Sequence, residues 1–198
     1  VTLAKREDLK ELRDLKEKVV AASQPNSFDG WLVAQHEIFK NGLDPENFFK
    51  RSVFTHFQFP DSLMLLIQGE ADVAILSACV LEQLSNEGLI EASDFKVLAQ
   101  KPQGVLRCAR STDLYPGIVF AAREDIPPKL KWEVTSALMS MPPTNDYEWT
   151  IASRFSKVDE LYRDLQLGPY QYLKDWSPAG ILKLSLIHIS EPTRPERI

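Results

Sequence analysis

Hydroxyl and amide side chains gather in a short loop, at the point where a strand is expected to end and a helix to begin. The loop Ser23–Ser27 (SQPNS) directly follows the apolar run Val19–Ala22. Ser and Asn are favoured at helix N-caps, because their side-chain oxygens accept hydrogen bonds from free backbone amides. The same amides, together with the helix dipole, can instead hold an anion. Two interpretations of Ser23, Asn26 and Ser27 therefore stay open: capping alone, or anion binding.

Two further strand ends are expected on the same rim. His56 stands near the end of the predicted strand Val53–Phe57, and Ser77 and Cys79 follow the predicted strand Asp72–Leu76. In an open α/β sheet, ligands bind beyond the carboxyl ends of the strands, where the strand order reverses. None of these residues is diagnostic alone, so the hypothesis of a binding site depends on the convergence of three strand ends.

Three aromatic residues are expected close to this rim. Phe28 lies just inside the start of a helix expected through Trp31, Ile38 and Phe39, and Tyr115 lies in a later loop. An aromatic ring at helical spacing contributes large apolar area to a core. We therefore expect Trp31 to serve packing as well as the site, and Phe28 to form a wall of the cleft.

An enzyme would need a nucleophile and a base, and the sequence offers little for either. It contains no G-x-S-x-G, P-loop, G-x-G-x-x-G or H-E-x-x-H motif, and we predict no cofactor and no metal site. A Cys–His pair of Cys79 or Cys108 with His56 stays an open alternative. His36, in the middle of a helix, is expected on the surface. The cysteines could form a disulfide in an oxidising compartment, or lie as small buried apolar residues, which we slightly favour.

Composition excludes other classes of function. The chain has 198 residues, a net charge of −5 and a pI near 5.3, which gives no electrostatic footprint for a nucleic acid. No apolar run approaches the roughly 20 residues of a membrane span. No signal peptide opens the chain. The tail 185–198 (SLIHISEPTRPERI) has no periodicity and resembles vector or adapter sequence, so it is left out of the fold prediction.

The elements that must position these residues alternate along the chain. Strands are predicted at 19–22, 53–57, 72–76 and 95–99, and helices at 5–18, 31–39, 60–67, 80–86, 128–141 and 156–167. Strands that alternate with helices indicate a mainly parallel sheet covered on both faces. The charged segment Lys5–Lys18 is expected to be a short solvated helix. Val105–Arg110 and Ile118–Ala122 are expected to be extended.

Several of these segments together resemble one family. Its members often carry S-P-N-S-F-G-G-W, F-T-G, G-E-A-D-V/A and S-T-x-L-Y-P motifs. Here the corresponding stretches are Ser23–Trp31 (with Gln24 inserted and Asp29 in place of a glycine), Phe54–Phe57, Gly69–Leu76 and Ser111–Pro116. The sequence over Leu15–Leu184 thus resembles the phosphonate-binding-protein-like periplasmic domains. It is most similar to the sensor domains of tetrathionate-sensor-type histidine kinases.

The resemblance implies an α/β, type II periplasmic-binding-protein fold with two lobes around a ligand cleft. Residues 1–112 would form the second lobe, 113–150 the return segment to a first lobe that is largely missing, 151–184 a C-terminal helix with a juxtamembrane segment, and 185–198 a non-native tail. It also implies that a membrane helix follows and that the domain is periplasmic. Whether the intact receptor forms a homodimer stays open.

The resemblance also implies cleft roles for particular residues. Two departures bear on an anion: Leu76-Ser77-Ala78 stands where an arginine is common, and Ala109-Arg110 stands where a histidine is common, so Arg110 would supply the cation. The resemblance implies cleft roles for Ser23, Asn26, Ser27, Phe28, Ser111, Thr112 and Tyr115. With the candidates at the predicted rim and Arg110, the full predicted ligand-binding set is Ser23, Asn26, Ser27, Phe28, Trp31, His56, Ser77, Cys79, Cys108, Arg110, Ser111, Thr112 and Tyr115.

Two functions follow as hypotheses. The first is the sensor domain of a two-component histidine kinase that catalyses nothing itself. It would bind a small anion, such as phosphonate, phosphate or a sulfur oxyanion, and signal through Tyr170–Ile181. The second is the substrate-binding protein of a phosphate or phosphonate ABC transporter.

Overall fold

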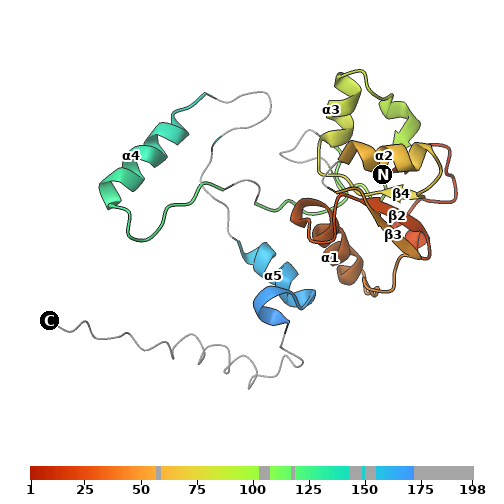
Figure 1. Cartoon of the computed structure of the whole chain (residues 1–198), viewed down its shortest axis with the longest axis horizontal. Coiled ribbons are helices and arrows are strands. Elements are labelled where there is room, and N and C mark those ends of the chain that lie inside the picture. Colours follow the sequence, from red (N-terminus) through yellow and green to blue (C-terminus); the bar gives the residue numbers. More distant parts are fainter. Residues whose placement is uncertain (57–58, 103–107, 117–118, 143–148, 150–154, 172–198) are drawn as a thin grey trace.

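A computed structural model describes residues 1–56, 59–102, 108–116, 119–142, 149 and 155–171 (Figure 1). The predicted extended segments Val105–Arg110 and Ile118–Ala122 lie only partly within these ranges. The tail 185–198 lies outside them, and so does most of the juxtamembrane segment.

Three parallel strands form the centre of the fold, as predicted. They are β2 (Val19–Ala22), β3 (Arg51–Phe54) and β4 (Val73–Ala74), in the order β3-β2-β4. In the register of the sheet, Val20 lies opposite both Ser52 and Val73. The central strand is apolar because it is covered on both faces, and its last three residues are fully buried.

The predicted fourth parallel strand, 95–99, is wrong. Only β5 (Phe95–Lys96) is extended there, and it pairs antiparallel with β1 (Thr2–Leu3) in a separate two-stranded sheet. The short strand β1 was not predicted from the sequence. It is held beside β4, because the Val1 amino group donates to the Ala74 carbonyl oxygen at 2.8 Å. β1 therefore pairs with β5 outside the parallel sheet.

The predicted solvated helix over Lys5–Lys18 is also wrong. This segment consists of turns and one short 3-10 helix, η1 (Leu12–Leu15), and it buries Leu9 and Leu15. Some of its charged side chains hydrogen-bond to nearby groups in the turns. The Asp14 carboxylate accepts from the backbone amides of Lys10 and Glu11. Such side-chain bonds to the backbone compete with helical ones.

Helices cover both faces of the sheet, and each face has its own core. On one face, α1 (Val33–Lys40) follows a single π-helical turn, η2 (Phe28–Leu32). On the other face lie α2 (Phe59–Ile67) and α3 (Val80–Asn86), as Figure 1 shows. The α1 core includes Trp31 and Ile38, and the second core includes Leu63. This layering confirms the predicted α/β class.

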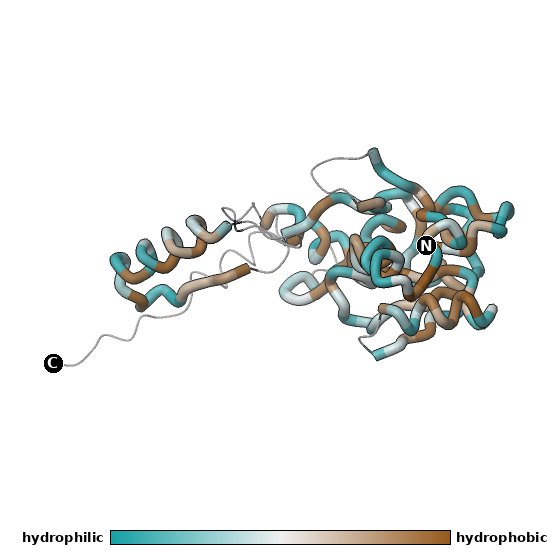
Figure 2. The backbone as a smooth tube through the Cα atoms, turned by 90° about the horizontal axis from the view of Figure 1, so that it is seen from above, coloured by the Kyte–Doolittle hydropathy of each residue, from teal (hydrophilic) through white to brown (hydrophobic). Residues whose placement is uncertain are grey.

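The two C-terminal helices differ in how they pack. Helix α5 (Ser156–Asp164) lies against α1 and fully buries Leu161. Helix α4 (Pro128–Met139) buries no residue and stands away from the sheet in both views (Figures 1 and 2). That 113–150 completes another lobe stays a prediction. Among the described residues, no helix is long and apolar enough to cross a membrane.

Candidate functional site

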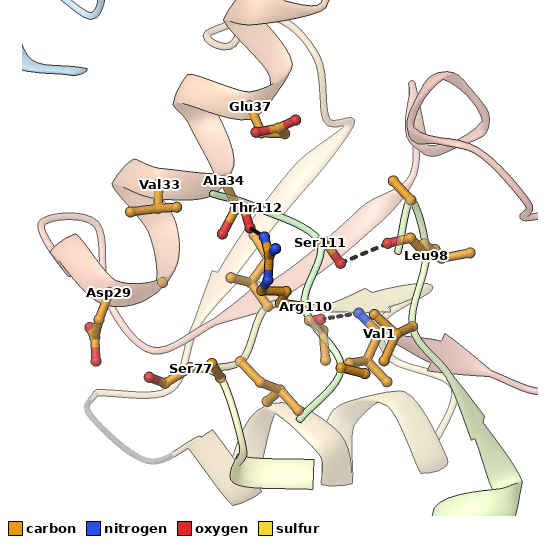
Figure 3. Close-up of a pocket in the computed structure, with 18 of the residues that line it drawn as sticks. Val1, Asp29, Val33, Ala34, Glu37, Ser77, Leu98, Arg110, Ser111 and Thr112 are labelled. Atoms are coloured by element: carbon orange, nitrogen blue, oxygen red, sulfur yellow. Dashed lines mark hydrogen bonds between the residues drawn. The ribbon is translucent and has the colours of Figure 1, made fainter. Parts of the chain in front are cut away.

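A cavity of about 360 Å³ lies at the carboxyl ends of β2 and β4 (Figure 3). Most of its lining comes from residues 28–38, 73–82 and 109–116. The chain passes from β2 to β3 on one side and then crosses to β4 on the other, so the strand order reverses between β2 and β4. The cavity therefore occupies the position at which open α/β sheets bind ligands.

The turn η2 sets the geometry of the first wall. The Leu32 amide donates to the Ser27 carbonyl oxygen at 2.9 Å, five residues back. The Ser27 hydroxyl does not cap this helix; it donates to the Asp29 carboxylate at 2.8 Å. Simple capping by Ser27, one of the two interpretations of this loop, is therefore wrong.

A second hydroxyl stands behind this wall. Ser23 follows β2 and is buried, and its Oγ has no hydrogen-bond partner among the described residues. A Cβ atom added to Gly30 would lie 3.6 Å from the Ser23 Oγ and 3.3 Å from the Ser27 Oγ. The absence of a side chain at Gly30 thus leaves open the space in front of both hydroxyls.

The structure brings some of the predicted residues to the cavity and leaves others away from it. Those that line it are Phe28, Ser77, Cys79, Arg110, Ser111, Thr112 and Tyr115. Ser23, Asn26, Ser27, Trp31, His56 and Cys108 do not line it. Asn26 and His56 are exposed, and His56 has a left-handed backbone with a φ of 54°. Trp31 is buried against Phe49 and Phe54, as expected for packing.

The two cysteines form a disulfide, so the slight preference for two separate buried thiols is wrong. Cys79 and Cys108 have Cα atoms 5.1 Å apart. Cys79 precedes α3 in a left-handed conformation. The disulfide ties this point to residues 109–116, which line the cavity and which we call the crossing segment. With both sulfurs in the bond, neither can be the thiolate nucleophile of a Cys–His enzyme.

Arg110 is the only arginine or lysine side chain among the described residues that line the cavity. Its Nη1 donates to the Thr112 carbonyl oxygen at 2.7 Å and its Nη2 to the Pro102 carbonyl oxygen at 3.2 Å. Figure 3 shows the bond to Thr112, with Val33 and Ala34 of α1 nearby. Its Nε is buried and has no partner among the described residues, and no carboxylate pairs with the guanidinium there.

The neighbouring lysines differ from Arg110 because carboxylates already pair with them. Lys40 and Lys101 both contact Glu37 and Asp113, at 3.1 to 3.3 Å. The hydrogen bond from Lys40, and then that from Lys101, lowers the pKa of Asp113 to about 2. These lysines are thus neutralised within the protein, whereas the charge of Arg110 is not.

His36 is the residue that the sequence analysis placed wrongly. It was expected on the surface, but its side chain is only 2% exposed. Its Nδ1 lies 2.9 Å from the Tyr115 hydroxyl and its Nε2 lies 2.9 Å from the Asp164 carboxylate. The signal was present in the sequence, because His36 stands four residues after Leu32 and three after Val33, on their side of the helix.

A half-buried guanidinium beside a cavity at this switch point is the arrangement of a ligand-binding α/β domain. Residues 1–162 match the family described as the periplasmic phosphonate substrate-binding protein of ABC transporters, and the chain belongs to this family. This match confirms the family resemblance.

A curated relative is also similar. The chain is 34% identical over 158 residues to the tetrathionate sensor histidine kinase TtrS of Salmonella typhimurium. The alignment covers 80% of the chain and 26% of that protein. The chain therefore spans about a quarter of the length of this relative.

Proposed function

We propose that this chain is the extracytoplasmic, ligand-binding sensor domain of a two-component histidine kinase, and that it binds a small oxyanion in the cavity beside β4. The observation that carries the proposal is Arg110, a cavity-lining cation with a buried, unpartnered Nε–H and no carboxylate partner among the described residues. The similarity to a sensor histidine kinase supports the signalling part.

Arg110 is suited to an oxyanion because of the groups around it. A guanidinium can donate several hydrogen bonds in one plane to an anionic group. A buried donor that lacks a partner costs free energy, so a ligand oxygen that accepts from it would bind with that advantage. Asp29 and Glu82 also line the cavity, which means that attraction depends on Arg110 rather than on a general positive field.

The binding set in this proposal combines three groups of residues. Arg110 and the hydroxyls of Ser111, Thr112 and Tyr115 would contact the anion from the crossing segment, and Ser77 from the end of β4. Ser23, Ser27 and Asn26 would add the second side through the space that Gly30 leaves open. Phe28 would close the apolar wall. Trp31 and the Cys79–Cys108 disulfide would support this set from outside the contact.

The ligand class is part of the proposal. The relative is named for tetrathionate and the family for phosphonate. Both anions end in a group in which oxygen acceptors surround one sulfur or phosphorus atom. We therefore keep phosphate, phosphonate and sulfur oxyanions as one class. The intact receptor would reach the membrane through a helix beyond residue 184, lie in the periplasm, and be able to dimerise.

A substrate-binding protein of a phosphate or phosphonate ABC transporter is the second candidate, and the description of the family favours it. The native gene decides between the two. A membrane helix and a kinase after residue 184 support the sensor, whereas a stop codon supports the transporter subunit.

The test is a thermal-shift titration with sodium tetrathionate, thiosulfate, phosphate and methylphosphonate. At least one should raise the Tm in proportion to its saturation. Arg110→Gln should weaken that binding about 10- to 100-fold, the range expected for a hydrogen bond to a charged group. Arg123→Gln is the matched control, because Arg123 is exposed and pairs only locally with Asp125. Equal affinity in Arg110→Gln and wild type would refute the role of Arg110.

A further inference from the structure

A buried histidine joins the wall of the cavity to the C-terminal helix. The Tyr115 hydroxyl lies 2.9 Å from the His36 Nδ1, and the His36 Nε2 lies 2.9 Å from the Asp164 carboxylate. Tyr115 lines the cavity, His36 belongs to α1, and Asp164 ends α5. One imidazole of α1 thus bonds two other segments, which lie 79 and 128 residues further along the chain.

The donors and acceptors of this chain of bonds follow from their chemistry. An ionised carboxylate only accepts, so the His36 Nε2–H donates to Asp164. In the tautomer that carries its proton on Nε2, Nδ1 is an acceptor, and the Tyr115 O–H donates to it. Burial raises the pKa of Tyr115, so its hydroxyl keeps the proton that it donates. The bonds therefore run in one direction, from the cavity wall to α5.

An aromatic contact runs beside the polar one. The ring of Phe28 meets Tyr115 edge-on, with centroids 5.6 Å apart, and stacks on Tyr162 of α5 at 6.4 Å. Phe28 and Tyr115 both line the cavity. Next to Tyr162, Leu161 is fully buried in the α1 core and holds α5 against it. A polar route and an aromatic route, which meet at Tyr115, thus connect the cavity wall with the same helix.

We propose that His36 is a positioning residue that couples occupancy of the cavity to the docking of α5 on α1. The inference rests on the proposed function, because it names the path by which bound anion would reach the C-terminal segment. A ligand that moves Tyr115 makes or breaks a directional bond to His36, and that bond orients the imidazole toward Asp164. Because coupling is reciprocal, firmer docking of α5 also favours the liganded state.

Packing alone does not require this arrangement. A leucine at position 36 would fill a buried site without needing two hydrogen-bond partners, whereas a buried imidazole is costly unless both nitrogens are satisfied. Linked polar groups in a low-dielectric interior also polarise one another, so a change at one end is felt at the other. A relay with two fixed partners can therefore report a small displacement of Tyr115.

The test uses the whole chain and substitutes Asp164, which does not line the cavity. Asp164→Ala removes the acceptor, and Asp164→Asn keeps an oxygen that accepts from Nε2–H. Ser156→Ala is the control, since Ser156 is an exposed residue at the start of the same helix whose hydroxyl makes no hydrogen bond among the described residues. The readouts are hydrogen exchange of the α5 amides and the NMR resonances of the His36 nitrogens and the Tyr115 ring carbon Cζ.

In the ligand-free protein, Asp164→Ala should speed exchange of the α5 amides about tenfold and shift the Tyr115 Cζ resonance, although residue 164 does not touch Tyr115. Asp164→Asn should restore both, and Ser156→Ala should change neither. An unmoved Tyr115 resonance in Asp164→Ala would overturn the relay, because loss of the acceptor at Asp164 would then leave the Tyr115–His36 bond unaffected.

Sodium tetrathionate then separates this inference from the proposed function. In wild type it should slow exchange in α5, and in Asp164→Ala this slowing should vanish while tetrathionate still raises the Tm. Equal slowing in both proteins would overturn the coupling. If tetrathionate raises the Tm of neither protein, the proposed function fails for this probe, while the ligand-free resonances still decide on the relay.

Discussion

The α/β body and the segment 119–142 carry similar apolar side chains but use them differently. In the body, large apolar residues of the helices form two cores on either side of the sheet. In the segment 119–142 they stay exposed: Trp132 is 71% exposed and Phe120 is 62% exposed, and α4 buries none of its residues. Both regions contain helices, so a helix alone does not indicate a folded core.

The difference shows which interactions make each region. Helix α4 begins with Pro128 in its first turn, a local signal for helix initiation. Helix α5 is shorter, but it buries Leu161 against α1 and bonds His36 through Asp164. Local preference is sufficient for the geometry of a helix, whereas stability comes from the apolar surface that it removes from water.

Removal of the disulfide should have the largest effect on the stability of the α/β body. Cys79 and Cys108 are 29 residues apart, and closing a loop of this size stabilises a fold by roughly 3–4 kcal/mol. We expect the double variant Cys79→Ser, Cys108→Ser to lose about this much free energy of unfolding in urea. Dithiothreitol should destabilise wild type equally and leave the variant unchanged. An unchanged wild-type midpoint under reduction would show that the disulfide does not hold the body.

A matched pair of leucines compares the two regions directly. Leu161→Ala in α5 should cost about 3 kcal/mol, because Leu161 is 0% exposed and its removal leaves a cavity. Leu130→Ala in α4 should change stability by less than about 0.5 kcal/mol, because Leu130 is 47% exposed. Urea denaturation of both variants measures the difference. Similar losses would mean that α4 packs in solution as α5 does, and the comparison would fail.

The smallest expected effect concerns the ion pairs between α1 and the crossing segment. Contacts with Lys40 and Lys101 lower the pKa of Asp113 from 3.8 to about 2. A lowered pKa in the folded state means that the stabilisation is present above pH 3.8 and is lost as the pH falls toward 2.

Asp113 is 38% exposed, so solvent screens these pairs and the contribution should stay below about 1 kcal/mol. Wild type should therefore be slightly more stable than Asp113→Asn at pH 6, and the two should converge near pH 2. The measurement is the Tm of each protein across this range. A constant difference in Tm at every pH would contradict this account.

Much of the body could be predicted from the sequence, because its signals are local. The apolar run Val19–Ala22 and the spacing in Val80–Asn86 correspond to β2 and α3. The strand β1 was missed because a strand of two residues is too short to show an alternating hydrophobic pattern. Its pairing with β5 also joins positions more than 90 residues apart in the chain. The segment Lys5–Lys18 was wrongly predicted as a helix, because leucines spaced among charged residues also fit a series of turns that buries Leu9.

The site was predictable in position but not in its contacts. Parallel strands place their carboxyl ends together, which located the cavity and several of its lining residues, such as Ser77 and Arg110. No spacing rule shows that Cys79 meets Cys108, or that His36 meets Asp164, since these distances depend on how separate segments cross. Sequence also could not show that His56 has a left-handed backbone and does not line the cavity.

The π-helical turn η2 has a consequence for how this protein can change over evolution. Its bonds span five residues rather than four, so it holds one residue more than an α-helical turn would. Losing any one of these residues would rotate everything after it by about 100° around the helix axis. The imidazole would then leave the face that meets Tyr115. The extra residue and the histidine should therefore be inherited together, or be lost together, as lineages diverge.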